Sequence, residues 1–284
     1  MDSAISLGNK TIIDARKAGY IKGEVNALRN TSTSLLMKGD FSTAKTNLNS
    51  AGELLLNNND STLLAGLFGA YGMMYGMQSM YDSANVYFQK ALTVAEIIGD
   101  SENIGRYYGN LAIGYQMQGN YPEALSYQQK SLRYAEERNN INSQAYVTLN
   151  MGNTYVNMSD YLRGEKALLR AVDLAMQAGI KNVEVYSYTN LASLYSDLED
   201  WEQTYTYAMK AVEIARELGD IPIEAASYSK AARAKANLNQ YDDAKLLIRK
   251  GTDAYPHLTL HINTPVSYLA ISYSHNEYRY MTAL

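Results

Sequence analysis

The sequence predicts an all-α fold in which antiparallel helix pairs are stacked along the chain. Three observations support this prediction: aromatic residues recur every 40 residues, small residues recur with the same period, and apolar residues within each unit follow helical spacing. The aromatic positions are Phe41, Tyr81, Tyr121, Tyr161, Trp201 and Tyr241. A fixed period of this length is typical of solenoid proteins, in which each unit packs only against its neighbours.

Two columns of small residues repeat in step with the aromatic positions. The first is Ala4, Ala44, Ala84, Ala124, Gly164, Thr204 and Ala244, and the second is Thr11, Ala51, Ala91, Ser131, Ala171, Ala211 and Gly251. Small side chains at fixed positions allow neighbouring helices to approach closely. We therefore expect the substitution Ala91→Leu to overpack the core and to lower the melting temperature.

A single unit shows how each repeat is predicted to fold. Tyr108, Leu111 and Tyr115 have the i, i+3, i+7 spacing of an amphipathic helix. Gly119 and the asparagine after it end this helix, because both residue types tolerate the left-handed conformation found at helix C-termini. Pro122 suits the first turn of a second helix, where no amide hydrogen is needed. Each unit is therefore predicted to contain two helices joined by a short turn.

The pattern Gly72…Tyr75…Tyr81…Ala84 resembles the tetratricopeptide repeat. The usual period of that family is about 34 residues, and the 40-residue variety found here is similar to repeats of kinesin light chains, spindle-orientation adaptors and bacterial peptide-sensing regulators. The resemblance covers essentially the whole chain, with local departures such as Lys235 in place of the tyrosine. It implies a right-handed solenoid of antiparallel helix pairs with about 6.5–7 repeats.

The phase of the pattern predicts one repeat array that starts and stops within a unit. The expected segments are a half-repeat at 1–20, repeats at about 21–60, 61–100, 101–140, 141–180, 181–220 and 221–260, and a partial repeat at 261–284. Solenoids normally end in capping repeats with polar outer faces, and neither end has one. We therefore expect the chain to be part of a longer protein, the alternative being a complete protein with incomplete terminal repeats.

Composition excludes several functional classes. The net charge of −4 argues against nucleic-acid binding, which usually requires a basic surface. The absence of cysteine excludes disulfides, thiol nucleophiles and cysteine-based metal sites. His257 and His261 are spaced i, i+4, but they follow a proline and are expected in a turn, where they would not share a metal-binding helix face. The sequence also has no run of about 18 apolar residues that could span a membrane.

No catalytic signature accompanies the repeats. The sequence contains no HExxH motif, no glycine-rich phosphate loop and no GxSxG motif. We therefore predict a non-catalytic chain without a cofactor. Its function is expected to reside in a binding surface.

The candidate binding surface is the side of each first helix that lies opposite its core residues. The resemblance implies that these helices line a concave groove that binds a peptide or protein segment. Along the chain this side changes from methionine-rich to asparagine-rich to basic. The candidate residues are Met73, Met77, Met117, Asn110, Asn150, Asn153, Asn157, Asn190, Ser193, Lys230 and Arg233.

Each of these groups has two interpretations. The asparagines could hydrogen-bond an extended peptide backbone, or they could bond neighbouring helices or face water. The methionines could form an adaptable apolar patch or belong to the core. Gly66, Gly69 and Gly76 could permit close approach of a ligand, or they could mark a flexible helix. Lys230 and Arg233 could receive an acidic side chain or a terminal carboxylate.

These features predict a protein- or peptide-binding module, the recognition or sensor region of a larger bacterial signalling protein. The alternatives are a cytoplasmic scaffold or adaptor, and a structural array that self-associates through uncapped ends. The sequence is compatible with the periplasmic part of a membrane-anchored sensor and with a cytoplasmic location.

Overall fold

The computed structural model describes residues 2–56 and 60–254, and these residues form thirteen α-helices without any strand. The helices are α1 (Asp2–Lys17), α2 (Ile21–Lys38), α3 (Phe41–Leu55), α4 (Ser61–Met77), α5 (Tyr81–Ile98), α6 (Ser101–Met117), α7 (Tyr121–Glu137), α8 (Ile141–Asn157), α9 (Tyr161–Ala178), α10 (Lys181–Asp197), α11 (Trp201–Leu218), α12 (Ile221–Asn237) and α13 (Tyr241–Ala254). In this part of the chain, no helix combines the length and the apolar character that a membrane span requires.

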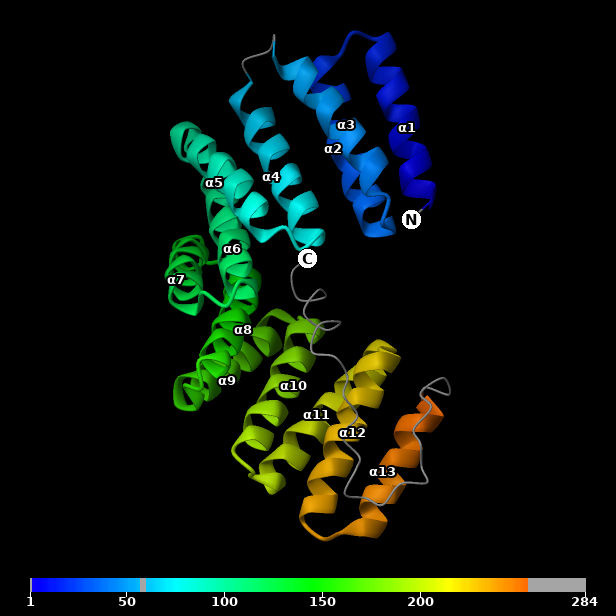
Figure 1. The fold of residues 1–284 in the computed structure, drawn as a ribbon, viewed down its shortest axis with the longest axis vertical. Coiled ribbons are helices and arrows are strands. Elements are labelled where there is room, and N and C mark those ends of the chain that lie inside the picture. The colour runs from blue at the N-terminus through cyan, green and yellow to red at the C-terminus, as the bar shows by residue number, and fades with distance from the viewer. Residues whose placement is uncertain (1, 57–59, 255–284) are drawn as a thin grey trace. The chain divides into compact units, whose positions relative to one another are not determined.

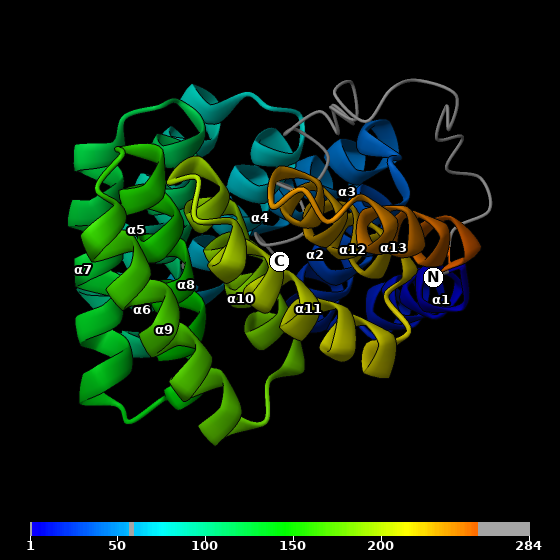
Figure 2. The same ribbon diagram turned by 90° about the horizontal axis from the view of Figure 1, so that it is seen from below.

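The helices belong to two compact units. The first unit, residues 1–134, contains α1 to α6 and most of α7, and the second unit begins at residue 135 and contains α8 to α13. Within each unit, consecutive helices run antiparallel and lie side by side (Figures 1 and 2). The all-α architecture of stacked helix pairs is therefore confirmed.

The turns repeat as regularly as the helices. Residues with positive φ occur every 20 residues wherever the turn is described: Gly19, Gly39, Ser79, Gly99, Gly119, Asn139, Ser159, Gly179, Glu199, Gly219 and Asn239. At Gly119, where the sequence predicted the end of a helix, φ is +75°. These left-handed residues allow the chain to reverse direction after a helix C-terminus.

Acidic and amide side chains begin many of the helices. Each accepts a hydrogen bond from the backbone N–H three residues later; the capping residues are Asp40, Asp60, Asp100, Asn140, Asp160, Asp200 and Asp220. A cap of this kind stabilises a helix by about 1 kcal/mol. The cap Asp220 stands just before Pro222, which lies in the first turn of α12, where no amide hydrogen is needed.

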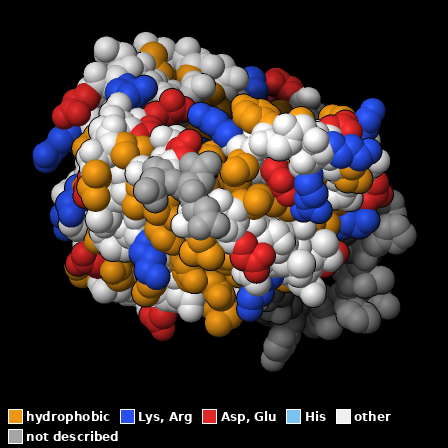
Figure 3. All heavy atoms as spheres, turned by 90° about the horizontal axis from the view of Figure 1, so that it is seen from above, with side chains coloured by type: hydrophobic (Ala, Val, Ile, Leu, Met, Phe, Trp, Pro, Cys, Tyr) orange, Lys and Arg blue, Asp and Glu red, His pale blue; other side chains and the backbone are white. Residues whose placement is uncertain are grey.

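From α3 onward the two columns of small residues are buried, as their spacing predicted, whereas Ala4 and Thr11 on α1 are exposed. Ala44, Ala51 and Ala91 have no exposed surface, and the same holds for Ala171 and Ala211 in the second unit. The larger core residues pack beside them; the most buried are Leu36, Leu48, Met74, Leu111, Leu149, Leu168, Leu191 and Leu194. In the view of Figure 3, hydrophobic, basic and acidic side chains are interspersed, and no single charge dominates.

Tyrosines join the two helices of several repeats. The ring centroids of the pairs Tyr75–Tyr87, Tyr115–Tyr127 and Tyr195–Tyr207 are 5.4, 5.5 and 5.4 Å apart, with the rings stacked. A lysine lies over the second ring of each pair; these are Lys90, Lys130 and Lys210. Stacking and the cation–π contact both favour this arrangement. The recurring tyrosines therefore contribute to packing within a repeat.

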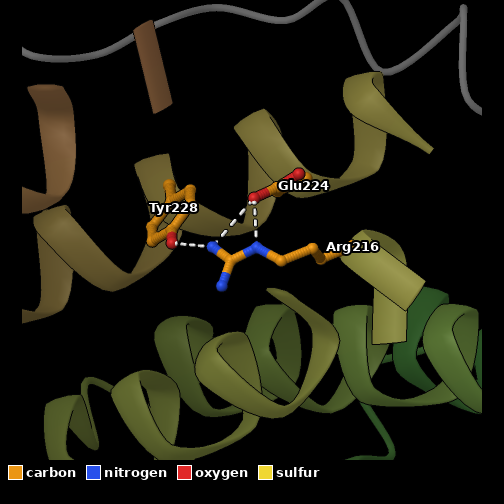
Figure 4. Close-up of polar contacts among 3 residues, drawn as sticks. All are labelled: Arg216, Glu224 and Tyr228. Atoms are coloured by element: carbon orange, nitrogen blue, oxygen red, sulfur yellow. Dashed lines mark hydrogen bonds and ion pairs between the residues drawn. The ribbon is translucent and has the colours of Figure 1, made fainter. Parts of the chain in front are cut away.

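An ion pair connects helices across the turn between α11 and α12. The guanidinium of Arg216 donates hydrogen bonds to Glu224, at 3.0 and 3.1 Å, and to the hydroxyl of Tyr228 (Figure 4). The same arrangement occurs at the corresponding turn of the first unit, where Arg16 lies 2.8 Å from Glu24. Both carboxylates are largely buried, so each arginine satisfies a group that would otherwise be costly to bury.

Candidate functional site

Three first helices of the second unit, α8, α10 and α12, are neighbours and present a common row of side chains. We define the second-unit face as the predicted residues Asn150, Asn153, Asn157, Asn190, Ser193, Lys230 and Arg233. All of them are partly or fully exposed, whereas Leu149, Leu191 and Ala231 beside them on the same helices are buried. The helical spacing thus directs these polar residues away from the core.

Hydrogen bonds link the second-unit face from one helix to the next. The Asn190 side-chain amide donates to Oδ1 of Asn153 at 2.5 Å, which joins α10 to α8. The ammonium of Lys230 donates to the hydroxyl of Ser193 at 2.6 Å, which joins α12 to α10. Arg233 donates to Ser196 in the same direction. Asn153 and Asn190 therefore do bond neighbouring helices, which was one of the two interpretations of the asparagines.

These bonds leave capacity for a ligand. An asparagine side chain offers two N–H donors and an acceptor oxygen. Oδ1 of Asn190 and the amide nitrogen of Asn153 make no hydrogen bond to any other described residue. The inter-helix bond fixes the direction in which both amides point. Binding at this row would therefore cost little side-chain entropy.

Lys230 is the most perturbed charge on the second-unit face. Burial lowers its pKa to about 8, the nearby Arg233 guanidinium lowers it further, and Asp197 opposes both effects. No carboxylate of the described helices forms an ion pair with Lys230. Two cations held close together without a direct counter-ion favour the approach of an anionic group.

Two tyrosines that the sequence reasoning did not single out lie on the same side of α8 and α10. Tyr146 is 41% exposed and is one turn before Asn150, and Tyr186 has the same relation to Asn190. Burial raises the pKa of Tyr186, with smaller contributions from Asp220 and Tyr146. The 40-residue offset between the two tyrosines is the signal that could have identified them.

In the first unit, the predicted residues lie on α4 and α6. Met73 and Met77 are partly buried, and each packs against one of two hydrophobic cores of this unit. Met117 and Asn110 on α6 are also partly buried. The contacts of Met73 and Met77 are those expected of residues at the edge of a core. Only part of the surface of Met73 and Met77 is therefore available to form an apolar patch for a ligand.

Side chains of the chain itself lie beside the glycines of α4. A Cβ atom at Gly66 would lie 1.9 Å from the guanidinium of Arg29, and one at Gly69 would lie 2.9 Å from the ring of Tyr107. Gly76 faces Ala84 on α5 at an ordinary contact distance of 3.8 Å. At Gly66 and Gly69 the structure therefore does not favour close approach of a ligand to the backbone, because side chains from α2 and α6 fill that space.

Some predictions concern residues that the structure does not describe. His257 and His261 and the partial repeat at 261–284 lie outside residues 2–56 and 60–254. Within those described ranges, no cluster of three or more histidine or acidic side chains is arranged to hold a metal ion.

Stacked helix pairs with a repeating turn geometry are typical of the α-solenoid repeat proteins. Residues 63–137 match the family model described as tetratricopeptide repeat, and residues 111–179 and 153–223 match the model described as anaphase-promoting complex subunit 5. The chain has the tetratricopeptide repeat fold, and the resemblance noted in its sequence is confirmed. No curated protein sequence matches this chain.

Several solved structures share this fold. A signal transduction ATPase with a tetratricopeptide repeat sensor from Pyrococcus horikoshii has a TM-score of 0.73 and 19% identity; the match covers 90% of this chain and 41% of that one. BtubC (BKLC) from P. vanneervenii has a TM-score of 0.69 and 18% identity, over 76% of this chain and 91% of that one. The apo quorum sensor NprR from B. thuringiensis has a TM-score of 0.66 and 14% identity, over 90% of this chain and 76% of that one. NprR has also been solved with its cognate peptide NprX.

Proposed function

We propose that the chain is a non-catalytic module that binds an extended peptide or protein segment on the second-unit face. The observation that supports this most directly is the continuous row of hydrogen-bonded amides, hydroxyls and cations across α8, α10 and α12. Such a row suits a ligand whose backbone offers donors and acceptors at regular intervals. The similar NprR fold, solved with its peptide, is consistent with this use of a tetratricopeptide solenoid.

The chemistry of the second-unit face suggests how the ligand is oriented. Asn153 and Asn190 would bond the peptide backbone at the middle of the face. Lys230 and Arg233 would receive an acidic side chain or a terminal carboxylate at the α12 end. Tyr146 and Tyr186 would contact an apolar side chain. The ligand would therefore be an acidic peptide with an apolar residue at a distance from its acidic group.

The experiment starts from peptides selected from a random display library against the purified chain. The double substitution Asn153→Ala and Asn190→Ala should weaken binding of the selected peptide by about tenfold, because two hydrogen bonds of about 0.5–1.5 kcal/mol each are lost. The substitution Gln177→Ala removes an exposed amide from α9 and should leave the affinity unchanged. If the double variant binds as tightly as the wild type, the amide row does not bind the ligand.

The wider role that we propose is recognition within a larger regulatory protein of bacteria. The P. horikoshii ATPase supports a place for these repeats in a larger signalling protein, because it combines a tetratricopeptide repeat sensor with an ATPase. Sequencing the gene on both sides of this chain tests it. A signal peptide before the chain and a transmembrane helix with a kinase or DNA-binding module after it is the expected result. An open reading frame confined to the repeats would instead favour a scaffold or adaptor.

A further inference from the structure

The first unit holds a second group of cations, on α2 and α6, that no ion pair neutralises. Arg29 on α2 extends over α4, so that its guanidinium occupies the space left by the missing side chain of Gly66. Arg106 on α6 lies against the ring of Tyr107, with its guanidinium carbon 5.9 Å from the ring centroid. Neither arginine forms an ion pair with any carboxylate of the described residues.

Tyr107 joins α6 to α4 beside this group. Its hydroxyl donates a hydrogen bond of 3.0 Å to the backbone oxygen of Ala65 on α4, and its ring covers Gly69. Burial raises the pKa of Tyr107, and the positive charges of Arg106 and Arg29 both oppose that rise. Both guanidinium groups are therefore close enough to the buried hydroxyl to act on it.

Asp100, whose charge also acts on Tyr107, is engaged elsewhere. Asp100 caps α6 by accepting a hydrogen bond from the backbone of Asn103, and its second oxygen accepts one from the Asn103 amide. Asn103 in turn accepts a hydrogen bond from Arg106. Arg106 is therefore oriented through a neutral amide, and Arg29 has no hydrogen-bond partner among the described side chains.

Partial burial of Arg29 without a counter-ion is unfavourable. Removal of a guanidinium from water disfavours its charge, and the Arg106 charge disfavours it further; both effects lower the pKa of Arg29. The chain nevertheless has glycine at 66, which gives Arg29 the space to occupy this position. An anion bound between the two arginines would offset this cost, as salt-bridged charges do in other sites.

We propose that Arg29 and Arg106 form a binding site for a phosphate-type dianion, presented on the α2–α4–α6 side of the first unit. Two guanidinium groups carry two positive charges, and each can donate paired hydrogen bonds to the oxygens of one phosphoryl group. The site is independent of the second-unit face, which lies on other helices. It adds an anion-recognising function to the module.

The test titrates the whole chain with inorganic phosphate at low ionic strength by isothermal titration calorimetry. Arg29→Gln and Arg106→Gln should each weaken phosphate binding by at least about tenfold, because a charge-assisted hydrogen bond contributes about 1.5–3 kcal/mol. The matched control Arg133→Gln removes an exposed arginine from α7 and should leave phosphate binding unchanged.

A second pair of variants tests the geometry and keeps every charge. Gly66→Ala places a methyl group where the Arg29 guanidinium lies and should weaken phosphate binding, whereas Gly76→Ala on the same helix has room for its Cβ and should not. The Arg29 side chain is flexible, so both variants are expected to fold, and thermal melting of each verifies this. Equal phosphate binding by Gly66→Ala and Gly76→Ala would overturn the proposal.

The choice of ligand is tested in the same calorimeter. Malonate carries two negative charges on planar carboxylates, and binding of malonate as tight as that of phosphate would overturn the assignment to a phosphoryl group. A phosphoserine peptide distinguishes the source of the group from free phosphate: tighter binding of the peptide, sensitive to Arg29→Gln, supports a ligand that carries its phosphate on a protein. No heat of phosphate binding to the wild-type chain would also overturn the proposal.

Discussion

Glu199, in the turn after α10, has a positive φ of 58°, a conformation that is unfavourable for residues with a Cβ atom. The turns after α9 and α11 have glycine at their positive-φ position, Gly179 and Gly219, whereas the turns after α8 and α12 have Ser159 and Asn239. The side chain of Glu199 makes no hydrogen bond to the described residues that would offset the cost. The repeat therefore tolerates strain here because the turn geometry is imposed by the packing of the helices on either side.

The substitution Glu199→Gly should stabilise the chain. Removal of the Cβ atom relieves about 1–2 kcal/mol of backbone strain. The greater conformational entropy of glycine in the unfolded chain offsets part of this stabilisation. We expect the free energy of unfolding in urea to rise by about 0.5–1 kcal/mol. The reverse change at an equivalent turn, Gly219→Ala, should lower it, because φ there is +67°. A decrease in stability for Glu199→Gly would show that its turn is not strained.

Helix packing in a repeat depends on the small residues between its helices. Ala91 on α5 is fully buried beside Phe88 and Leu111. The substitution Ala91→Leu adds three carbon atoms at this position and should lower the free energy of unfolding by about 1–3 kcal/mol, because overpacking displaces neighbouring side chains and helices. Thermal melting followed by circular dichroism measures the change.

A matched control for Ala91→Leu is available in helix α1. Ala4 belongs to a column of small residues that is buried in the next repeats, yet Ala4 itself is exposed. Ala4→Leu adds the same atoms on the surface of the first unit and should leave the melting temperature nearly unchanged. Equal melting curves for Ala91→Leu and the wild type would contradict the core position assigned to the column that contains Ala91.

The helices and turns were predictable from the sequence because the residue patterns that specify them are local and repeat along the chain. The turn at Gly119 and the burial of the small columns from α3 onward each depend on residues within a few positions, and each recurs every 40 residues. Contacts of long side chains between helices were not predictable in this way. Arg29 reaches from α2 to α4 to fill the space above Gly66, and predicting this contact requires the packing of the two helices to be known.

The candidate site shows the same division. The helical period placed Asn153 and Asn190 on the solvent side of their helices, where the structure also has them. It could not show that the two amides bond each other, since residues 37 positions apart meet only after the helices pack. Tyr146 and Tyr186 were overlooked because tyrosine is so frequent here that their repeat was not distinctive; the chain contains 26 tyrosines.

Tyrosine burial affects the stability of the whole molecule at alkaline pH. The pKa is raised, in each case chiefly by burial, at Tyr71, Tyr107, Tyr108, Tyr127, Tyr186, Tyr188, Tyr195 and Tyr207. For Tyr71 and Tyr108 it reaches about 12. The unfolded chain releases these protons near pH 10, whereas the folded chain retains them to higher pH. Their contribution to stability is thus present below about pH 10 and is lost as the pH rises toward 12.

Lys230 acts in the opposite direction at lower pH. Its pKa is lowered to about 8 in the folded chain, so between about pH 8 and pH 10 the unfolded state binds more protons at this residue than the folded state does. Stability therefore increases with pH in this interval, because the folded chain no longer holds a partly buried charge. The lysine and the tyrosines together predict a stability maximum near pH 10.

We expect the free energy of unfolding in urea to rise from about pH 8 to about pH 10 and then to fall toward pH 12. The fluorescence of Trp201, which is the only tryptophan, follows unfolding, and tyrosinate absorbance follows the titration. Lys230→Met removes the titrating lysine and should abolish the rise while leaving the alkaline fall. If the rise persists in Lys230→Met, another group causes it; if stability does not fall above pH 10, the tyrosines are not protected from ionisation by the fold.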